Sequence, residues 1–186
     1  MRKLSIILIS IGVAFILTSI CMLCYNIYCD ENAKSKSNEV RNKLEKIIIN
    51  SEIETKEVST IKIDDNNYIG VIYIESLDLK LPIMNDWDYK KMQIAPCRYY
   101  GAIETNDLVI CAHSYKSMFA NLKKLSQKDK VIITDVNNNE YVYEVELIEI
   151  LKPEEVSAMI DSEFDLTLFT CTSDSSNRVT VRLNRI

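Results

Sequence analysis

The first hydrophobic pattern in the chain is an unbroken apolar run near the N-terminus. Residues 4 to 29 contain no charged side chain. At about 1.5 Å per residue, a helix of this length exceeds the roughly 30 Å hydrocarbon core of a bilayer. A cleaved signal peptide would end in a small-residue cleavage site, and no A-x-A pattern occurs near residues 20 to 32. The run therefore predicts an uncleaved transmembrane anchor within residues 1 to 30.

The second pattern has a helical period and covers residues 31 to 58. This segment is polar and contains neither Pro nor Gly. Val40, Leu44, Ile47 and Ile48 recur near helical spacing, with charged residues between them. The pattern predicts a helix, which forms either a stalk or a layer packed on the domain that follows.

From residue 61 onward, short segments rich in β-branched and aromatic residues alternate with polar breaks. The expected strands cover residues 68–74, 79–81, 108–112, 130–135, 141–151, 165–171 and 178–184. The asparagines at 137–139 predict a hairpin turn, and the apolar spacing of residues 118–125 predicts a short helix. Many short strands separated by turns predict a mostly β domain over residues 59 to 186, either a closed or nearly closed barrel or a sandwich.

Charge adds an orientation and excludes one class of partner. The net charge is −5 and the pI about 5.1, so a nucleic-acid-binding role, which needs a basic face, is not expected. Arg2 and Lys3 precede the apolar run, whereas Asp30 and Glu31 follow it. By the positive-inside rule, this contrast predicts a single-pass membrane protein with a cytoplasmic N-terminus and an extracellular domain.

Three of the six cysteines, Cys97, Cys111 and Cys171, lie in the expected external domain. An odd number of cysteines outside the cytosol leaves at least one thiol unpaired. A Cys97–Cys111 disulfide fits this count, although the sequence does not establish that the two are close. The simpler interpretation is that these two are small buried hydrophobic residues.

Two expected strands end in side chains that suit acyl-transfer chemistry. His113, the only histidine, follows the strand 108–112, and Cys171 ends the strand 165–171. Arg178 opens the last strand after six polar residues. If these strands pair as a hairpin, the Cβ atoms of Cys171 and Arg178 lie roughly 5 Å apart. A guanidinium at that distance favours the thiolate and can donate to an oxyanion. Each residue alone has a plain structural interpretation, so only the combination is specific.

The segment around this cysteine resembles the T-L-x-T-C signature of the sortase family. Residues 167–171 read T-L-F-T-C, and a strand-opening arginine follows, as in that family. The stretch before His113 is similar to the segment preceding the sortase histidine, with Ala112 where glycine is usual. Residues 118–132 resemble the family's F-x-x-L-x-x-L-x-x-G-D-x-I stretch, with Lys128 in place of glycine. Together with opening strands similar to the family's, the resemblance covers residues 66 to 186.

The resemblance implies an eight-stranded sortase-type β-barrel and an exported cysteine transpeptidase of Gram-positive bacteria. Cys171 would attack the threonine carbonyl of an LPxTG-like sorting signal on a secreted protein and form a thioester. An amine of a cell-wall precursor or a pilin lysine would resolve this thioester. His113 would act as general acid and then as base, and Arg178 would hold the substrate and stabilise the oxyanion. Neither a cofactor nor a metal is expected.

Further roles are expected close to these residues. Thr170 and Ser114 are assigned to substrate binding beside the catalytic residues, as are Glu154 and Val156 in the loop 152–163. Arg182, four residues after Arg178 on the same strand face, is the alternative arginine. The short interval between expected strands 141–151 and 165–171 leaves no room for the inserted helix of class B sortases. A compact class A-, D- or E-like enzyme is therefore expected.

Three other classes compete with this interpretation. L,D-transpeptidases keep histidine and cysteine almost adjacent in S-H-G-C, whereas here His113 and Cys171 lie far apart in the sequence. A papain-like peptidase would place its cysteine before the histidine, the reverse of the order here. A catalytically inactive sortase-like domain that binds a partner is the non-enzymatic alternative, which the departures at Ala112 and Lys128 keep open.

Overall fold

The structure is a computed structural model in which residues 2–51 and 59–186 are described. Its first element, α1 (Arg2–Ser51), crosses the boundary between two compact units, residues 1–32 and Ala33–Ile186. In the first unit, the side chains from Ile6 to Tyr28 are exposed. An 18-residue window of this helix reaches a mean hydropathy of 2.7, and the helix is long and apolar enough to cross a membrane. It is therefore a candidate membrane span, as the sequence predicts.

In the second unit, the remaining part of α1 packs on a β-barrel. Val40, Leu44 and Ile48 recur at helical spacing and are buried against a cluster that includes Tyr68 and Met84. The segment around residues 31–51 is therefore a helix packed on the domain, one of the two arrangements that its sequence allows. The part of the predicted stalk between 52 and 58 lies outside the described residues.

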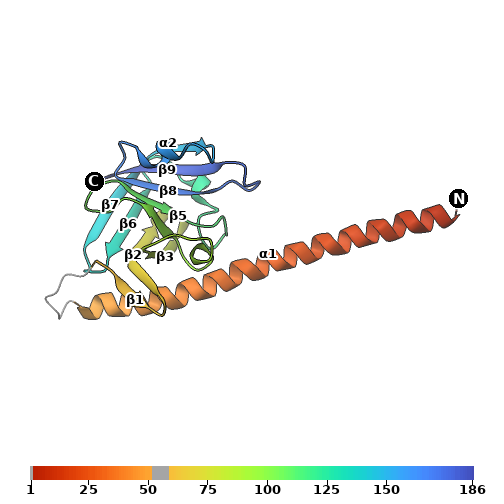
Figure 1. Cartoon of the computed structure of the whole chain (residues 1–186), viewed down its shortest axis with the longest axis horizontal. Coiled ribbons are helices and arrows are strands. Elements are labelled where there is room, and N and C mark those ends of the chain that lie inside the picture. The colour runs from red at the N-terminus through yellow and green to blue at the C-terminus, as the bar shows by residue number, and fades with distance from the viewer. Residues whose placement is uncertain (1, 52–58) are drawn as a thin grey trace. The chain divides into compact units, whose positions relative to one another are not determined.

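Nine strands form one sheet, and eight of them close into a barrel. The strands are β1 (Ile61–Ile63), β2 (Asn66–Ile74), β3 (Leu79–Met84), β4 (Cys97–Tyr100), β5 (Leu108–Cys111), β6 (Lys130–Asp135), β7 (Glu140–Leu151), β8 (Leu166–Cys171) and β9 (Arg178–Arg185). Their order is β1-β2-β3-β4-β5-β8-β9-β7-β6, and β2 also pairs with β6 (Figure 1). This last pairing closes a ring from β2 to β6, with β1 added as a hairpin strand. The predicted eight-stranded barrel is confirmed.

Short helical segments connect the strands. They are the 3-10 turns η1 (Glu75–Leu77), η2 (Lys91–Gln93) and η3 (Leu122–Lys124) and the helix α2 (Val156–Ile160). The predicted helix over 118–125 is wrong, because only η3 is helical there and the preceding residues form turns. Its apolar residues are nevertheless buried in the core. The apolar spacing of residues 118–125 therefore indicates which residues of the turn are buried, and not a helix.

The barrel interior is filled by one large cluster of aliphatic and aromatic side chains, which includes Ile72, Ile110, Leu168 and Val181. Alternation along each strand sends these residues inward and their neighbours outward. Gly70 is required where β2 meets β6, because a Cβ there would lie 2.2 Å from the Thr134 carbonyl oxygen. The outward-facing positions of β5, β8 and β9 are therefore available for a site.

Candidate active site

The outer faces of β5, β8 and β9 bring the candidate catalytic residues together. In the antiparallel β8–β9 pair, Cys171 is directly opposite Arg178, which confirms the pairing that the sequence predicts. In the parallel β5–β8 pair, Cys111 is opposite Phe169. Phe169 and Cys171 are two residues apart, so they share a face of the sheet. His113 follows β5 by two residues and completes the group.

A cavity of about 180 Å³ lies at this face. Cys171, His113 and Arg178 all line it, although they come from separate parts of the sequence. The other lining residues are Trp87, Tyr89, Met92, Tyr99, Cys111, Ala112, Lys152, Pro153, Glu155, Val156, Met159, Phe169 and Thr170. The cavity is therefore an apolar slot with a thiol, an imidazole and a guanidinium on its surface.

His113 lines this cavity from the segment that follows β5. Its Nε2 atom is buried and has no hydrogen-bond partner among the residues that the structure describes. The ring stacks on Tyr115 with centroids 5.1 Å apart. Burial lowers the pKa of His113, and an interaction with the Tyr89 backbone partly opposes this shift. The ring thus lies at the cavity with Nε2 unpartnered among the described residues.

Arg178 keeps hydrogen-bond donors available. One terminal nitrogen of its guanidinium donates to the Asn177 carbonyl at 3.0 Å and the Ser175 carbonyl at 3.5 Å. Within residues 2–51 and 59–186, no carboxylate forms a salt bridge with Arg178. A guanidinium has five N–H donors, so most remain for a ligand in the cavity. The charge beside Cys171 is thus not neutralised by a fixed partner.

The expected substrate-binding residues divide into two pairs. Thr170 and Val156 line the cavity, whereas Ser114 and Glu154 are exposed and do not. The buried hydroxyl of Thr170 donates to the Ala112 carbonyl at 2.8 Å. This bond fixes β8 to the residue that precedes His113. Thr170 therefore positions the histidine segment, and its hydroxyl proton is already used.

The sequence interpretation missed an aromatic wall on the cavity. Ring centroids lie 5.4 Å apart for Trp87 and Tyr99 and 5.2 Å apart for Tyr99 and Phe169. Trp87 and Tyr89 come from the loop between β3 and β4. The signal that could have found this wall is the placement of the only tryptophan beside a tyrosine within a charged loop, residues 85–91.

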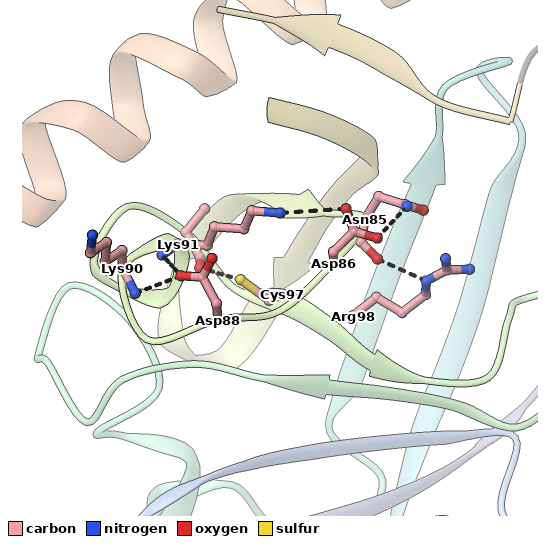
Figure 2. A network of polar contacts seen from close by, with 8 residues as sticks. Asn85, Asp86, Asp88, Lys90, Lys91, Cys97 and Arg98 are labelled. Carbon is pink, nitrogen blue, oxygen red and sulfur yellow. Dashed lines mark hydrogen bonds and ion pairs between the residues drawn. The ribbon is translucent and has the colours of Figure 1, made fainter. Parts of the chain in front are cut away.

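A network of polar contacts joins residues of the β3–β4 loop (Figure 2). Asp88 Oδ1 accepts hydrogen bonds from the backbone N–H groups of Lys90 and Lys91, at 2.7 and 2.8 Å. The Lys91 ammonium lies 3.4 Å from the Asp86 carboxylate. These contacts are made by residues that flank Trp87 and Tyr89 in the loop.

Two further cysteines lie near the site, Cys111 in the cavity lining and Cys97 on the neighbouring strand β4. They are directly opposite each other across β4 and β5, and both are buried, as expected for small hydrophobic residues. Both are free thiols. Burial raises the pKa of Cys97 to about 12 and raises the pKa of Cys111 as well. Neither has the character of a reactive thiolate.

Comparison with known proteins places the chain in one family. The family model of the sortase domain matches residues 72–186, so the chain belongs to the sortase family. Sortase A from Bacillus anthracis is 28% identical over 133 residues, which cover 67% of this chain and 63% of that protein. The chain thus spans about 63% of the length of this curated relative.

Solved sortases share the fold. Sortase C1 from Streptococcus agalactiae has a TM-score of 0.59 and 26% identity, covering 67% of this chain and 70% of that one. A sortase D5 transpeptidase from Clostridium perfringens has a TM-score of 0.59 and 20% identity, covering 82% of this chain and 97% of that one. The second likeness, at its low identity, concerns the fold alone.

The two departures from the family pattern have different structural consequences. Lys128 has φ +73°, in the left-handed region that favours glycine, so the lysine stands where the backbone prefers glycine. Ala112 has no such backbone, and it is buried in the barrel core with 4% exposure. The backbone at 112 therefore does not require glycine, and Ala112 is one of the residues that line the cavity.

Proposed function

We propose that this protein is a cysteine transpeptidase that cleaves an LPxTG-like sorting signal and transfers the acyl group to an amine. The observation that carries the proposal is that Cys171, His113 and Arg178 line one cavity, with Arg178 directly opposite Cys171. Membership of the sortase family supports the same chemistry. The proposed localisation is the cell membrane, with the N-terminus cytoplasmic and the barrel outside.

In the first half-reaction, the Cys171 thiolate attacks the threonine carbonyl carbon of the donor peptide. The C–N bond to the following glycine breaks, and the leaving amine takes a proton from the His113 imidazolium. Arg178 donates hydrogen bonds to the carbonyl oxygen while it carries negative charge. The product is a thioester between the donor threonine and Cys171.

In the second half-reaction, an amine attacks the thioester carbonyl. The now neutral His113 accepts a proton from this amine at Nε2, and the C–S bond breaks to release the Cys171 thiolate. The proposed acceptors are an amine of a peptidoglycan precursor or a pilin lysine, and water gives hydrolysis as a side reaction. The cavity's apolar surface, which includes Val156, suits the apolar residues that precede the threonine.

The test uses the full-length chain in detergent, a library of LPxTG-like peptides and an amine acceptor. Mass spectrometry follows donor cleavage, the acyl-enzyme and the amide product. We expect Thr–Gly cleavage and an adduct on Cys171, both lost in Cys171→Ala. Cys97→Ala is the matched control, because that thiol is buried away from solvent. A folded parent that forms no adduct with any peptide would favour the inactive binding domain.

A further inference from the structure

A second arginine on β9, Arg182, binds the segment that forms one wall of the cavity, on the side away from the cavity. Arg182 is only 3% exposed and does not line the cavity. Its Nε donates to Glu149 Oε1 at 2.8 Å, and one terminal nitrogen donates to Thr167 Oγ1 at 2.9 Å. Glu149 belongs to β7 and Thr167 to β8, so the guanidinium joins the two strands that flank β9.

The other donors of Arg182 reach α2. They bond to the carbonyl oxygens of Ala158 and Met159, the latter at 3.2 Å. The last carbonyls of a helix have no partner within the helix, so a buried cation that donates to them satisfies both their hydrogen bonding and the helix dipole. Four donor contacts leave the guanidinium of Arg182 nearly saturated.

The helix that Arg182 holds forms one wall of the cavity. Val156 and Met159 of α2 line the cavity. Met159 is buried and packs with Val109 and Leu151 against the outer face of the barrel. At the start of this segment, the Lys152 backbone N–H donates to Glu155 Oε2 at 2.7 Å. The segment is thus held at its start by a local bond, in its middle by apolar packing and at its end by Arg182.

We infer that Arg182 is a positioning residue for donor binding: it fixes the α2 wall against which the donor peptide packs. This inference rests on the proposed transpeptidase function. Arg182 contacts none of Cys171, His113 or Arg178, so it acts on where the substrate lies and not on bond making. A residue with this role affects the KM for the donor much more than kcat.

Substitution by lysine is an informative test, because lysine keeps the positive charge but lacks the planar guanidinium with its several hydrogen-bond donors. In Arg182→Lys, one ammonium cannot reach Glu149, Thr167 and both α2 carbonyls in the same geometry. We expect the KM for the donor to rise about tenfold, with kcat within about twofold of the parent. Hydrogen exchange of the amides in residues 156–165 should become faster, while those of β8 remain protected.

Arg185→Lys is the matched control on the same strand. Arg185 also donates to a carbonyl, that of Ile103 at 2.9 Å, and it lies over the Tyr141 ring at 4.8 Å, away from the cavity. The Arg185→Lys variant should be less stable than the parent, with no change in the KM for the donor peptide. A merely structural loss lowers the folded fraction, which circular dichroism measures, and leaves the KM of the folded fraction unchanged.

The experiment uses the full-length chain in detergent and the library peptide that the parent cleaves fastest. An unchanged KM in folded Arg182→Lys, or a fall in kcat alone, would overturn the positioning role. If the parent cleaves no peptide, the proposed function fails and the donor role fails with it. Slower or unchanged exchange of residues 156–165 would show that Arg182 does not hold α2, whatever the activity.

Discussion

Two arginines on strand β9, four residues apart and on the same outer face, have opposite surroundings. Arg178 lies at the start of the strand, lines the cavity and makes hydrogen bonds to two loop carbonyls. Arg182 is buried and bonds to a carboxylate, a hydroxyl and two helix carbonyls. The sequence spacing alone makes either of them a candidate for the arginine that stabilises an oxyanion.

The difference shows that the number of uncommitted guanidinium N–H groups distinguishes an arginine that can act on the substrate from one that holds the protein together. A guanidinium can stabilise a developing charge only with N–H groups that are free to turn toward it. Arg182 has committed four of its donor contacts to the protein, so it stabilises a wall of the cavity. Arg178 retains free donors opposite Cys171, so it is the arginine we assign to the reaction.

The largest effect is expected from Arg178→Ala. Loss of one oxyanion donor costs about 10²- to 10³-fold in kcat in other acyl-transfer enzymes, and we expect a loss of at least this size here. The side chain makes only two carbonyl contacts, so the thermal midpoint should stay within about 2 °C of the parent. Donor cleavage under saturating peptide measures the first quantity, and circular dichroism the second. If Arg178→Ala keeps a kcat near that of the parent, Arg178 does not have the catalytic role.

Arg182→Met should mainly lower the stability of the fold, whereas Arg178→Ala mainly lowers kcat. It leaves Thr167 Oγ1 and the α2 carbonyls without a donor, and an unsatisfied buried polar group costs about 1–3 kcal/mol. Glu149 is 32% exposed and can turn to water, so we expect a total loss of about 2–3 kcal/mol in the free energy of unfolding. Urea titration measures it. A variant as stable as the parent would mean that the Arg182 contacts contribute little.

The contrast between the two arginines could be predicted only in part. The strand patterns and the T-L-F-T-C segment were enough to predict the barrel. They also predicted that Cys171 lies opposite Arg178 and that His113 lies near them. Strand β4 was missed because it is four residues long, has a bulge and carries Arg98. The partners of Arg182 come from β7, β8 and α2, and no local pattern indicates which carbonyl oxygens a buried guanidinium will reach.

The cavity wall from the β3–β4 loop was missed for a related reason. Trp87 and Tyr89 lie in a charged loop with no hydrophobic period, so a sequence pattern classes them as surface residues. Trp87 contacts Tyr99 of β4, and Tyr99 in turn contacts Phe169 of β8. Ser114 and Glu154 show the converse: being adjacent in sequence to His113 and Glu155 does not bring a side chain to the cavity.

His113 offers a test of whether the cavity leaves the imidazole without a charged partner. Since it is the only histidine, the proton NMR spectrum contains one imidazole to titrate. We expect a midpoint below the ordinary value of 6.5, because burial disfavours the charged ring. The unfolded chain then binds more protons below pH 6.5, so stability falls as the pH drops through the folded pKa. A midpoint above 6.5 would indicate a carboxylate partner in solution.

The smallest effect is expected outside the cavity, at Lys128. Its φ of +73° costs a non-glycine residue about 1 kcal/mol, and its backbone N–H donates to the Val145 carbonyl at 2.9 Å, which holds that conformation. Lys128→Gly should therefore stabilise the fold by a few tenths to about 1 kcal/mol, after the entropy that glycine adds to the unfolded chain is subtracted. Lys128→Ala is the control, because alanine keeps the strain and should not stabilise. Since Lys128 is outside the cavity, both variants should keep the parent's kcat and KM, and a change in either would show that the turn before β6 is coupled to the site.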